Sequence, residues 1–258
     1  MDPASAFRAA MPAGHATGPV LATTVQHFRR DTRRVAIPHP EVQLVARFAP
    51  SIDGGVDIHA LGPRTRVHRK FIHGGQRALL VRLRPGTCDA ALGSPASDLG
   101  DDPVPLEALW GGADAGRLRE RLARTDDAGN ASRLLHATLS QRTGRTRPAA
   151  VPLPLLDVAL GKLEAANVGT VARDLGLSER HLRRVLRGAL GIGPKTYARL
   201  KRFETAVRLA QRTPAPAWTC IAADAGYYDQ AHLIADFHAI AGCTPGRLLA
   251  ELREGEAS

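Results

Sequence analysis

Residues 177–187, LSERHLRRVLR, place four arginines and one histidine within eight positions. The leucines and the valine recur at helical spacing and form one apolar stripe. The arginines recur at the same spacing and form a second stripe beside it: Arg180, Arg183, Arg184 and Arg187. Ser178 is a favourable N-cap residue, and Gly191 lies where a helix would end in the left-handed conformation. The pattern predicts a short amphipathic helix with an exposed face made almost entirely of arginine.

The residues before this helix distinguish two interpretations of its charge. A charged helix face is often only solvated, and the repulsion among the arginines would then go uncompensated. Here the preceding residues 170–176, TVARDLG, form a second short apolar stripe that ends at Gly176. Two short helices joined by a tight turn containing glycine make a helix-turn-helix, whose second helix enters the DNA major groove. Guanidinium groups pair with guanine edges and phosphates, so DNA would neutralise the arginine face.

The same unit occurs twice in the chain. Four positions match at an offset of 50: Val171, Ala172, Asp174 and Gly176 with Ile221, Ala222, Asp224 and Gly226. After one extra residue in the second turn, four more match at an offset of 51: Leu182, Leu186, Gly191 and Pro194 with Leu233, Phe237, Gly242 and Pro245. A shared apolar and Gly/Pro pattern with different surface residues indicates two copies of one structural unit.

The residues between the two copies predict a connecting helix. Residues 195–212, KTYARLKRFETAVRLAQR, keep one apolar stripe over about 18 residues, which corresponds to a helix of roughly 27 Å. Successive major-groove faces on one side of B-DNA lie about 34 Å apart. A connecting helix of this length could place two recognition helices in adjacent major grooves.

Together these motifs resemble one known family. Residues from about 155 to 250, with VARDLGLSERHLRRVLRGALGIGPKTYARLKRFETAVRLA and IAADAGYYDQAHLIADFHAIAGCTP, are similar to the DNA-binding domain of AraC/XylS transcription regulators. The resemblance implies an all-α domain with two helix-turn-helix units that bind double-stranded DNA. It also implies base-facing positions in each recognition helix: Arg180, Arg183 and Arg184 in the first, and Gln230, Ala231, His232 and Ala235 in the second.

The second recognition helix departs from the family pattern. Members often have basic residues where Ala235 and His238 stand, and Asp236 is expected to add a negative charge near the DNA side. We therefore expect the first unit to read most of the DNA sequence and the second mainly to set the register. The predicted DNA-binding residues are Ser178, Arg180, His181, Arg183, Arg184, Arg187, Gln230 and His232. Catalytic, cofactor-binding and metal-binding residues are not predicted, and the chain is not expected to be an enzyme.

Composition favours a polyanionic partner without locating its site. The 258-residue chain has a formal net charge of +10 and is long enough for two domains, each with its own core. Residues 1–150 carry 21 basic and 14 acidic side chains, whereas the remaining residues carry 14 and 11. The half that contains the two helix-turn-helix patterns is therefore not the more basic half.

The cysteines and the apolar runs bear on the cellular compartment. Cys88, Cys220 and Cys243 are scattered, and their spacing offers neither a disulfide framework nor a zinc site. The first 20 residues lack the charged start and the apolar core of a signal peptide. Since no run approaches the roughly 18 apolar residues of a membrane span, we expect a cytoplasmic protein without a membrane partner.

The N-terminal half has a different pattern. Short β-like runs separated by Gly and Pro occupy four segments: 42–48, 55–62, 65–72 and 78–86. Two helical patterns follow within residues 111–142. The expected fold class is α+β, with a β-rich barrel or sandwich and trailing helices before the all-α C-terminal domain. Residues 140–154, SQRTGRTRPAAVPLP, predict an exposed linker, which gives domains at 1–148 and 149–258. Residues 1–30 are expected to be flexible in part.

The N-terminal half also resembles, more loosely, an N-terminal module of some AraC-type regulators. The matching residues are LGPRT, RLRPGTCDAALGSPASDLGDDPVPLEALWG and RLRERL. In AraC-type proteins this domain commonly binds a small effector, dimerises, or does both. The resemblance implies a sensor or dimerisation domain, with a small-molecule effector, a second copy of the chain and RNA polymerase as expected partners.

A second hypothesis treats the N-terminal half as a cupin-like metalloenzyme or ligand-binding protein that the C-terminal domain tethers to DNA. His59, His68 and His73 lie on successive β-like segments, as the metal ligands of such barrels do, but a paired glutamate is missing. A nucleophilic Cys88 would need a base, and the sequence pairs none with it. We therefore favour the regulator.

Overall fold

A computed structural model describes residues 18–125, 127–145 and 152–257 of the chain. The N-terminal strands are β1 (Val20–Phe28), β2 (Thr32–Ala36), β3 (Gln43–Phe48), β4 (Val56–Leu61), β5 (His68–Ile72), β6 (Gln76–Leu83) and β7 (Val104–Pro105). The N-terminal helices are the short 3₁₀ turns η1 (Asp53–Gly55) and η2 (Ala96–Asp98) and α1 (Cys88–Leu92), α2 (Leu106–Trp110), α3 (Gly112–Ala123) and α4 (Ala128–Arg145). The C-terminal helices are α5 (Leu153–Leu163), α6 (Val168–Asp174), α7 (Glu179–Leu190), α8 (Pro194–Gln211), α9 (Trp218–Asp224), α10 (Gln230–Ala241) and α11 (Pro245–Ala257).

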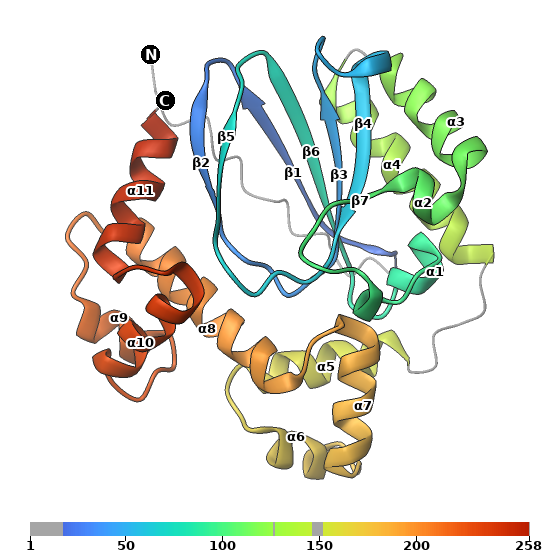
Figure 1. Ribbon diagram of the computed structural model, residues 1–258. Helices are drawn as coiled ribbons and strands as arrows, with labels where there is room; N and C mark the ends of the chain where they lie inside the picture. Colours follow the sequence, from blue (N-terminus) through green and yellow to red (C-terminus); the bar gives the residue numbers. More distant parts are fainter. Residues whose placement is uncertain (1–17, 126, 146–151, 258) are drawn as a thin grey trace.

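The strands form one antiparallel sheet and one separate two-stranded ribbon (Figure 1). The sheet has the order β1-β6-β3-β4-β7, and β2 pairs with β5 in the ribbon. Because side chains alternate between the faces of a strand, one face of the sheet is continuously apolar, with Leu44, Ile58 and Val81 at its centre. The helices α1–α4 pack on this face, so the N-terminal core lies between the sheet and these helices.

Two segments differ from the sequence-based expectation. Residues 1–17 lie outside the described residues, but Val20–Phe28, expected within a partly flexible segment, is the edge strand β1 and pairs with β6. Residues 140–145, expected in the linker, continue helix α4 beyond its buried Leu139. The predicted boundary at 148 falls among residues 146–151, outside the described part of the chain.

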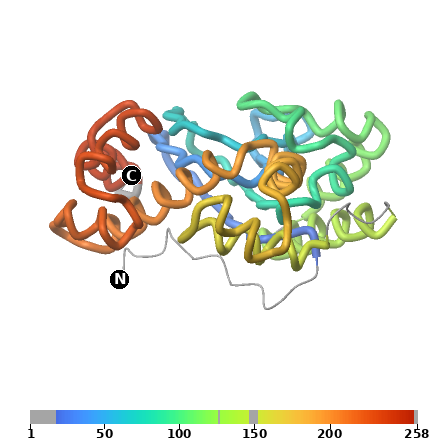
Figure 2. Tube along the Cα trace, turned by 90° about the horizontal axis from the view of Figure 1, so that it is seen from below, coloured from blue at the N-terminus to red at the C-terminus, as the bar shows by residue number. Residues whose placement is uncertain are grey.

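The C-terminal part repeats one helical arrangement (Figures 1 and 2). Helices α6 and α7 form the first helix-turn-helix, α9 and α10 form the second, and the 18-residue helix α8 connects them as predicted. Both first helices have seven residues and both recognition helices have twelve. Each unit has its own apolar core around the residues that define the repeat: Leu182 and Leu186 in one, Leu233 and Phe237 in the other. The α+β class, with an all-α C-terminal domain that carries two helix-turn-helix units, is confirmed.

The N-terminal part contacts both recognition helices near their carboxyl ends. The Gly86 N–H donates to the Ala189 carbonyl of α7 at 3.1 Å, and the Val67 N–H donates to the Ile240 carbonyl of α10 at 2.8 Å. Val35 of the ribbon also packs against the core of the second unit. Figure 2 shows α8 passing along the N-terminal part from one unit to the other. The two units are therefore both docked on the same domain.

Glu204 of α8 joins the connecting helix to the N-terminal part. Its carboxylate lies 3.4 Å from His39 Nδ1, 3.7 Å from Arg82 Nη1 and 2.9 Å from Lys201 Nζ. Burial by itself raises the pKa of Glu204, but the contact with His39 and the charge of Lys201 outweigh it and lower the pKa to about 2. Glu204 is therefore ionised at neutral pH and fixes α8 against the loop of His39 and the strand β6.

Candidate nucleic-acid interface

Helix α7 has the caps and the buried stripe that its sequence predicts. Ser178 Oγ accepts a hydrogen bond from the His181 N–H at 3.2 Å, and Gly191 ends the helix with a φ of 76°. Three leucines are at most 1% exposed and pack in the core of the first unit: Leu182, Leu186 and Leu190. These contacts determine which side of α7 faces solvent.

The solvent side of α7 carries the predicted arginines. All four are exposed: Arg180, Arg183, Arg184 and Arg187. Arg183 Nη2 donates to Glu179 Oε2 at 3.0 Å, and Arg184 Nη2 lies 3.1 Å from His181 Nδ1. The side chains of Arg180 and Arg187 have no hydrogen-bond or ion-pair partner among the described residues. Among the described residues, the arginine face is therefore neutralised only by Glu179 of the same helix, and it remains open to an external anion.

Neighbouring elements pack closely around the first unit. Lys162 of α5 pairs with Asp174 at the end of α6 at 2.7 Å, which joins these two helices. At the carboxyl end of α7, a Cβ at Gly191 would lie 2.6 Å from the Ala96 carbonyl oxygen of η2. Glycine at position 191 therefore permits both the left-handed turn and the close approach of the N-terminal part.

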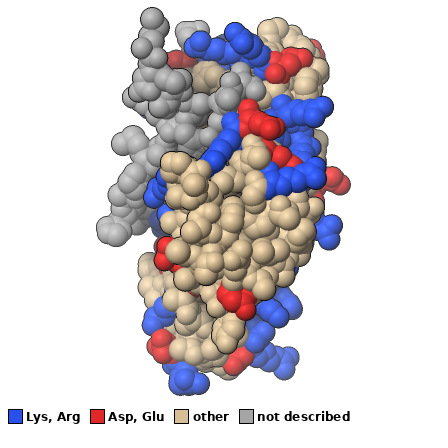
Figure 3. Space-filling view, turned by 90° about the vertical axis from the view of Figure 1, so that its left-hand side faces the viewer, with Lys and Arg blue, Asp and Glu red and all other residues tan. Residues whose placement is uncertain are grey.

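Helix α10 has the same skeleton as α7 with fewer charges. Asp229 Oδ1 accepts a hydrogen bond from the His232 N–H at 2.7 Å, and Gly242 ends the helix with a φ of 70°. Gln230 Oε1 accepts from the Thr219 hydroxyl at 2.8 Å, while the His232 side chain is exposed. On the side of the molecule that the second unit occupies, charged side chains are sparse at the centre and gather towards the margins (Figure 3). The second unit thus presents mainly polar and apolar groups.

Asp236 does not lie where the sequence analysis placed it. Its side chain is 8% exposed, and its Oδ1 accepts a hydrogen bond from Arg199 Nε of α8 at 2.7 Å. The expectation of a negative charge near the DNA side is wrong, because position 236 belongs to the buried stripe of α10 between Leu233 and Ile240. The carboxylate instead ties the second unit to the connecting helix.

The sequence analysis missed Tyr228 as a surface residue of the second unit. Tyr228 is 94% exposed and directly precedes the N-cap Asp229, whereas its neighbour Tyr227 is buried. The one signal for it was the extra residue in the turn of the second copy. Tyrosine at such a position can contact the sugar-phosphate backbone beside a recognition helix.

The N-terminal histidines and Cys88 do not form a recognisable reactive site. Burial, followed by the neighbouring charge of Arg47, lowers the pKa of His59 to about 4, while His73 is largely exposed near Asp31. Within the described residues, no three His, Cys, Asp or Glu side chains are grouped closely enough to hold a metal ion. Burial raises the pKa of the Cys88 thiol to about 12, which disfavours the nucleophilic thiolate. Nothing in this part supports the metalloenzyme hypothesis.

Comparison with known families bears directly on the repeated helices. Residues 171–251, which span α6 to α11, match a family described as a helix-turn-helix domain. These residues form a helix-turn-helix domain, and the predicted AraC/XylS resemblance of the C-terminal part of the chain is thereby confirmed.

Several solved structures of ToxT from Vibrio cholerae have an arrangement similar to that of this chain. ToxT from strain O395 aligns at a TM-score of 0.42 and 10% identity, over 89% of this chain and 96% of that chain. ToxT bound to (E)-4-(8-methylnaphthalen-1-yl)but-3-enoic acid aligns at 0.44 and 9%, over 89% and 97%. Unsaturated fatty acid bound ToxT aligns at 0.41 and 10%, over 89% and 95%. At these TM-scores the likeness carries no functional argument, and no curated protein matches the chain.

No helix of the described residues combines the length and the apolar character that crossing a bilayer requires.

Proposed function

We propose that the chain reads an asymmetric DNA site of roughly two turns, with α7 in one major groove and α10 in the next. The exposed arginine face of α7 carries this proposal. Its four guanidinium groups project from a helix whose opposite side is locked in the core, and such groups suit guanine edges and phosphates. The residues assigned to DNA are those predicted: Ser178, Arg180, His181, Arg183, Arg184, Arg187, Gln230 and His232.

We assign unequal roles to the two units. The first supplies most of the base reading through Arg183 and Arg184, and the second sets the register through Gln230, His232 and backbone contacts. Since the two recognition surfaces differ, one chain has no reason to prefer a palindrome. A symmetric site would require two chains paired through their N-terminal domains.

The N-terminal domain, residues 1–148, acts in this proposal as a sensor or dimerisation domain for the C-terminal domain, residues 149–258. Its contacts with both recognition helices support a role in transmitting an effector signal to the DNA-binding surface. The same proposal places the protein in the cytoplasm, where it meets DNA and RNA polymerase.

A selection of bound sequences from random DNA with the purified chain tests the proposal. The recovered site should be asymmetric and about two turns long. In titrations at fixed salt, Arg183→Ala or Arg184→Ala should weaken binding to this site by about 1–3 kcal/mol and relax the base preference at one position. Arg121→Ala on the exposed surface of α3 is the matched control and should leave both unchanged.

The salt dependence of binding supplies a second test of the same assignment. Affinity should fall steeply with salt, because each arginine that neutralises a phosphate releases a condensed counterion. Binding that does not depend on salt, or Arg183 and Arg184 variants with the affinity and specificity of the original chain, would mean that the arginine face of α7 is only solvated.

A further inference from the structure

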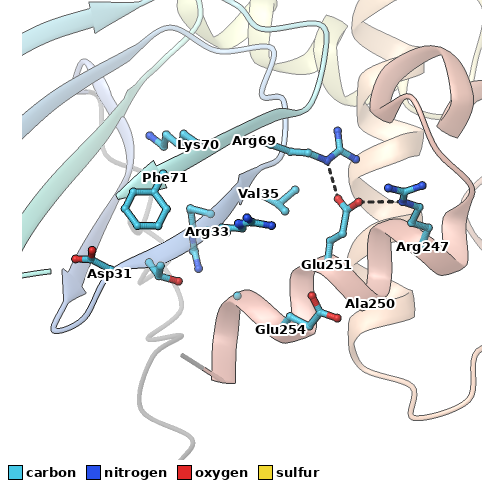
Figure 4. Close-up of a pocket in the computed structure, with 13 residues that line it drawn as sticks. Asp31, Arg33, Val35, Arg69, Lys70, Phe71, Arg247, Ala250, Glu251 and Glu254 are labelled. Carbon is cyan, nitrogen blue, oxygen red and sulfur yellow. Dashed lines mark hydrogen bonds and ion pairs between the residues drawn. The ribbon is translucent and has the colours of Figure 1, made fainter. Parts of the chain in front are cut away.

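A cavity of about 870 Å³ lies where the β2–β5 ribbon meets the C-terminal helix α11 (Figure 4). This volume is in the range of small-molecule sites. One wall comes from the N-terminal domain and the other from the second helix-turn-helix unit. The lining residues on which the argument depends are Arg33, Val35, Arg69, Phe71 and Glu251.

The strand register determines which ribbon side chains face α11. Arg33 is paired with Phe71, and Val35 with Arg69, so these four side chains share one face of the ribbon. On α11 the lining residues recur at helical spacing and form one stripe towards the ribbon: Arg247, Ala250, Glu251 and Glu254. The cavity is therefore built by two regular surfaces and not by an irregular loop.

One ion-pair network at the edge of the cavity connects the two domains. Glu251 Oε2 accepts from Arg69 Nε at 2.7 Å, and its Oε1 accepts from Arg247 Nε at 3.3 Å (Figure 4). Arg69 also donates to the Ala241 carbonyl at 3.0 Å, at the end of α10. A ligand in this cavity would therefore lie directly beside the contact through which the ribbon holds the second unit.

The ribbon face towards α11 carries one cation without a partner. The carboxylates that line the cavity are engaged: Glu251 binds two arginines, Asp31 accepts from the Gly74 N–H at 2.8 Å, and Glu254 also has an interaction partner. By contrast, the side chain of Arg33 has no hydrogen-bond or ion-pair partner among the described residues. An unpaired guanidinium group at the edge of an open cavity favours an anion at this position.

An aromatic side chain lies next to the unpaired Arg33. Phe71 is 56% exposed, and it shares its face of the ribbon with Arg33. Val35 and Ala250 add apolar surface to the two walls. The lining thus combines a cationic group with an uncovered apolar surface within one cavity.

We propose that this cavity binds a small organic anion, with its charged group on Arg33 and its apolar body on Phe71. The proposal rests on the proposed regulatory function, since it assigns a site and a chemical class to the effector. The bound anion competes with Glu251 for Arg69, and it thereby changes how the ribbon holds α10 and α11. Occupancy of the cavity is coupled in this way to the position of the second recognition helix.

Naphthalene-2-sulfonate is a suitable probe, because it has an apolar body and a charge that does not titrate. Calorimetry with the full chain should show saturable binding of this probe, whereas sulfate alone and neutral 2-naphthol should bind much more weakly. Arg33→Gln and Phe71→Ser should each reduce the affinity for the probe about tenfold. Both side chains are exposed, so these variants should fold normally. Arg66→Gln, an exposed arginine outside the cavity, is the matched control.

The coupling is measured as the affinity for the selected DNA site with and without the saturating probe. We expect a change of about fivefold or more in the original chain and none in Phe71→Ser. The effector site would be overturned if the original chain did not bind the probe, or if Arg33→Gln and Phe71→Ser bound it as tightly as the original chain. It would also be overturned if saturation with the probe left the DNA affinity unchanged. Because the DNA affinity without the probe is measured in the same series, failure of DNA binding itself is recognised separately.

Discussion

The two helix-turn-helix units share a skeleton and differ in their surfaces. Both recognition helices begin at a side-chain cap and end at a left-handed glycine: Ser178 and Gly191 in α7, Asp229 and Gly242 in α10. At the offset of 51 residues, the four arginines of α7 correspond to Ala231, Ile234, Ala235 and His238 in α10. Caps and core leucines thus fix the fold of a unit, while the outer positions can change without altering it.

One difference between the units is internal. Val185 of α7 corresponds to Asp236 of α10, and the buried carboxylate at 236 binds Arg199 of the connecting helix. The first unit therefore rests on apolar contacts at this position, whereas the second uses an ion pair. An ion pair removed from water is stable only while both partners are present.

Among the substitutions that test this difference between the units, the loss of Arg199 should have the largest effect on stability. Arg199→Met keeps an apolar side chain but leaves Asp236 buried without its partner, so it should lower the free energy of unfolding by about 1–3 kcal/mol. The double variant Arg199→Met/Asp236→Val, which gives the second unit the residue of the first, should recover most of that loss in denaturant titrations. A double variant no more stable than Arg199→Met would show that the ion pair is not the relevant difference.

The contacts of Glu204 should give a smaller, pH-dependent effect. The pKa of Glu204 is lowered to about 2 in the folded chain, below the usual carboxyl value of about 4.3. Its contribution to stability should therefore be complete above about pH 4.3 and should be lost as the pH falls towards 2. Glu204→Gln should flatten the stability profile in this window. If Glu204→Gln retained the full acid dependence, other carboxylates would account for it.

Adding charge to the second unit should sharpen the comparison at the DNA surface. Ala235→Arg restores at α10 the residue that α7 has at Arg184. The new arginine should steepen the salt dependence of DNA binding by about 0.9 in the logarithmic slope, and Arg187→Ala, which removes an arginine not assigned to base reading, should reduce it by the same amount. Anisotropy titrations at several salt concentrations measure both slopes. An unchanged slope in Ala235→Arg would mean that α10 does not approach the phosphates.

Tyr228 should give the smallest effect. Tyr228→Ser removes a 94% exposed ring, so the free energy of unfolding should stay within about 0.5 kcal/mol of the original value. The affinity for the selected site should fall only a few-fold, and equally for all DNA sequences, because the expected contact is with the backbone. A change in base preference would instead assign Tyr228 to sequence reading.

The C-terminal fold could be predicted from sequence because its information is local. Caps, helical periodicity and glycine positions lie within a few residues of one another, and the repeat presents them twice. The strand β1 was missed because its pairing with β6 joins positions about 50 to 60 residues apart, from Phe28 with Gln76 to Val20 with Leu83. The orientation of Asp236 was missed for a similar reason, since its partner Arg199 belongs to another helix.

The exposed arginine face of α7 could be predicted from the sequence more completely than the cavity between the two domains. Arg180 and Arg187 are exposed as expected, because their positions depend only on the phase of one helix. The cavity at Phe71 could not be predicted, since it exists only where a ribbon of one domain meets the last helix of the other. Residues that form sites between domains carry no sequence signature of their own.

The contacts of Gly86 with Ala189 and of Val67 with Ile240 have a geometric consequence. Ala189 and Ile240 occupy the same place in the two copies, so the N-terminal domain binds each recognition helix through the corresponding peptide group. These two equivalent hydrogen bonds constrain the distance between the recognition helices in addition to the connecting helix. A fragment beginning at residue 151 would lack both hydrogen bonds, and it should tolerate half-sites at variable separation that the whole chain rejects.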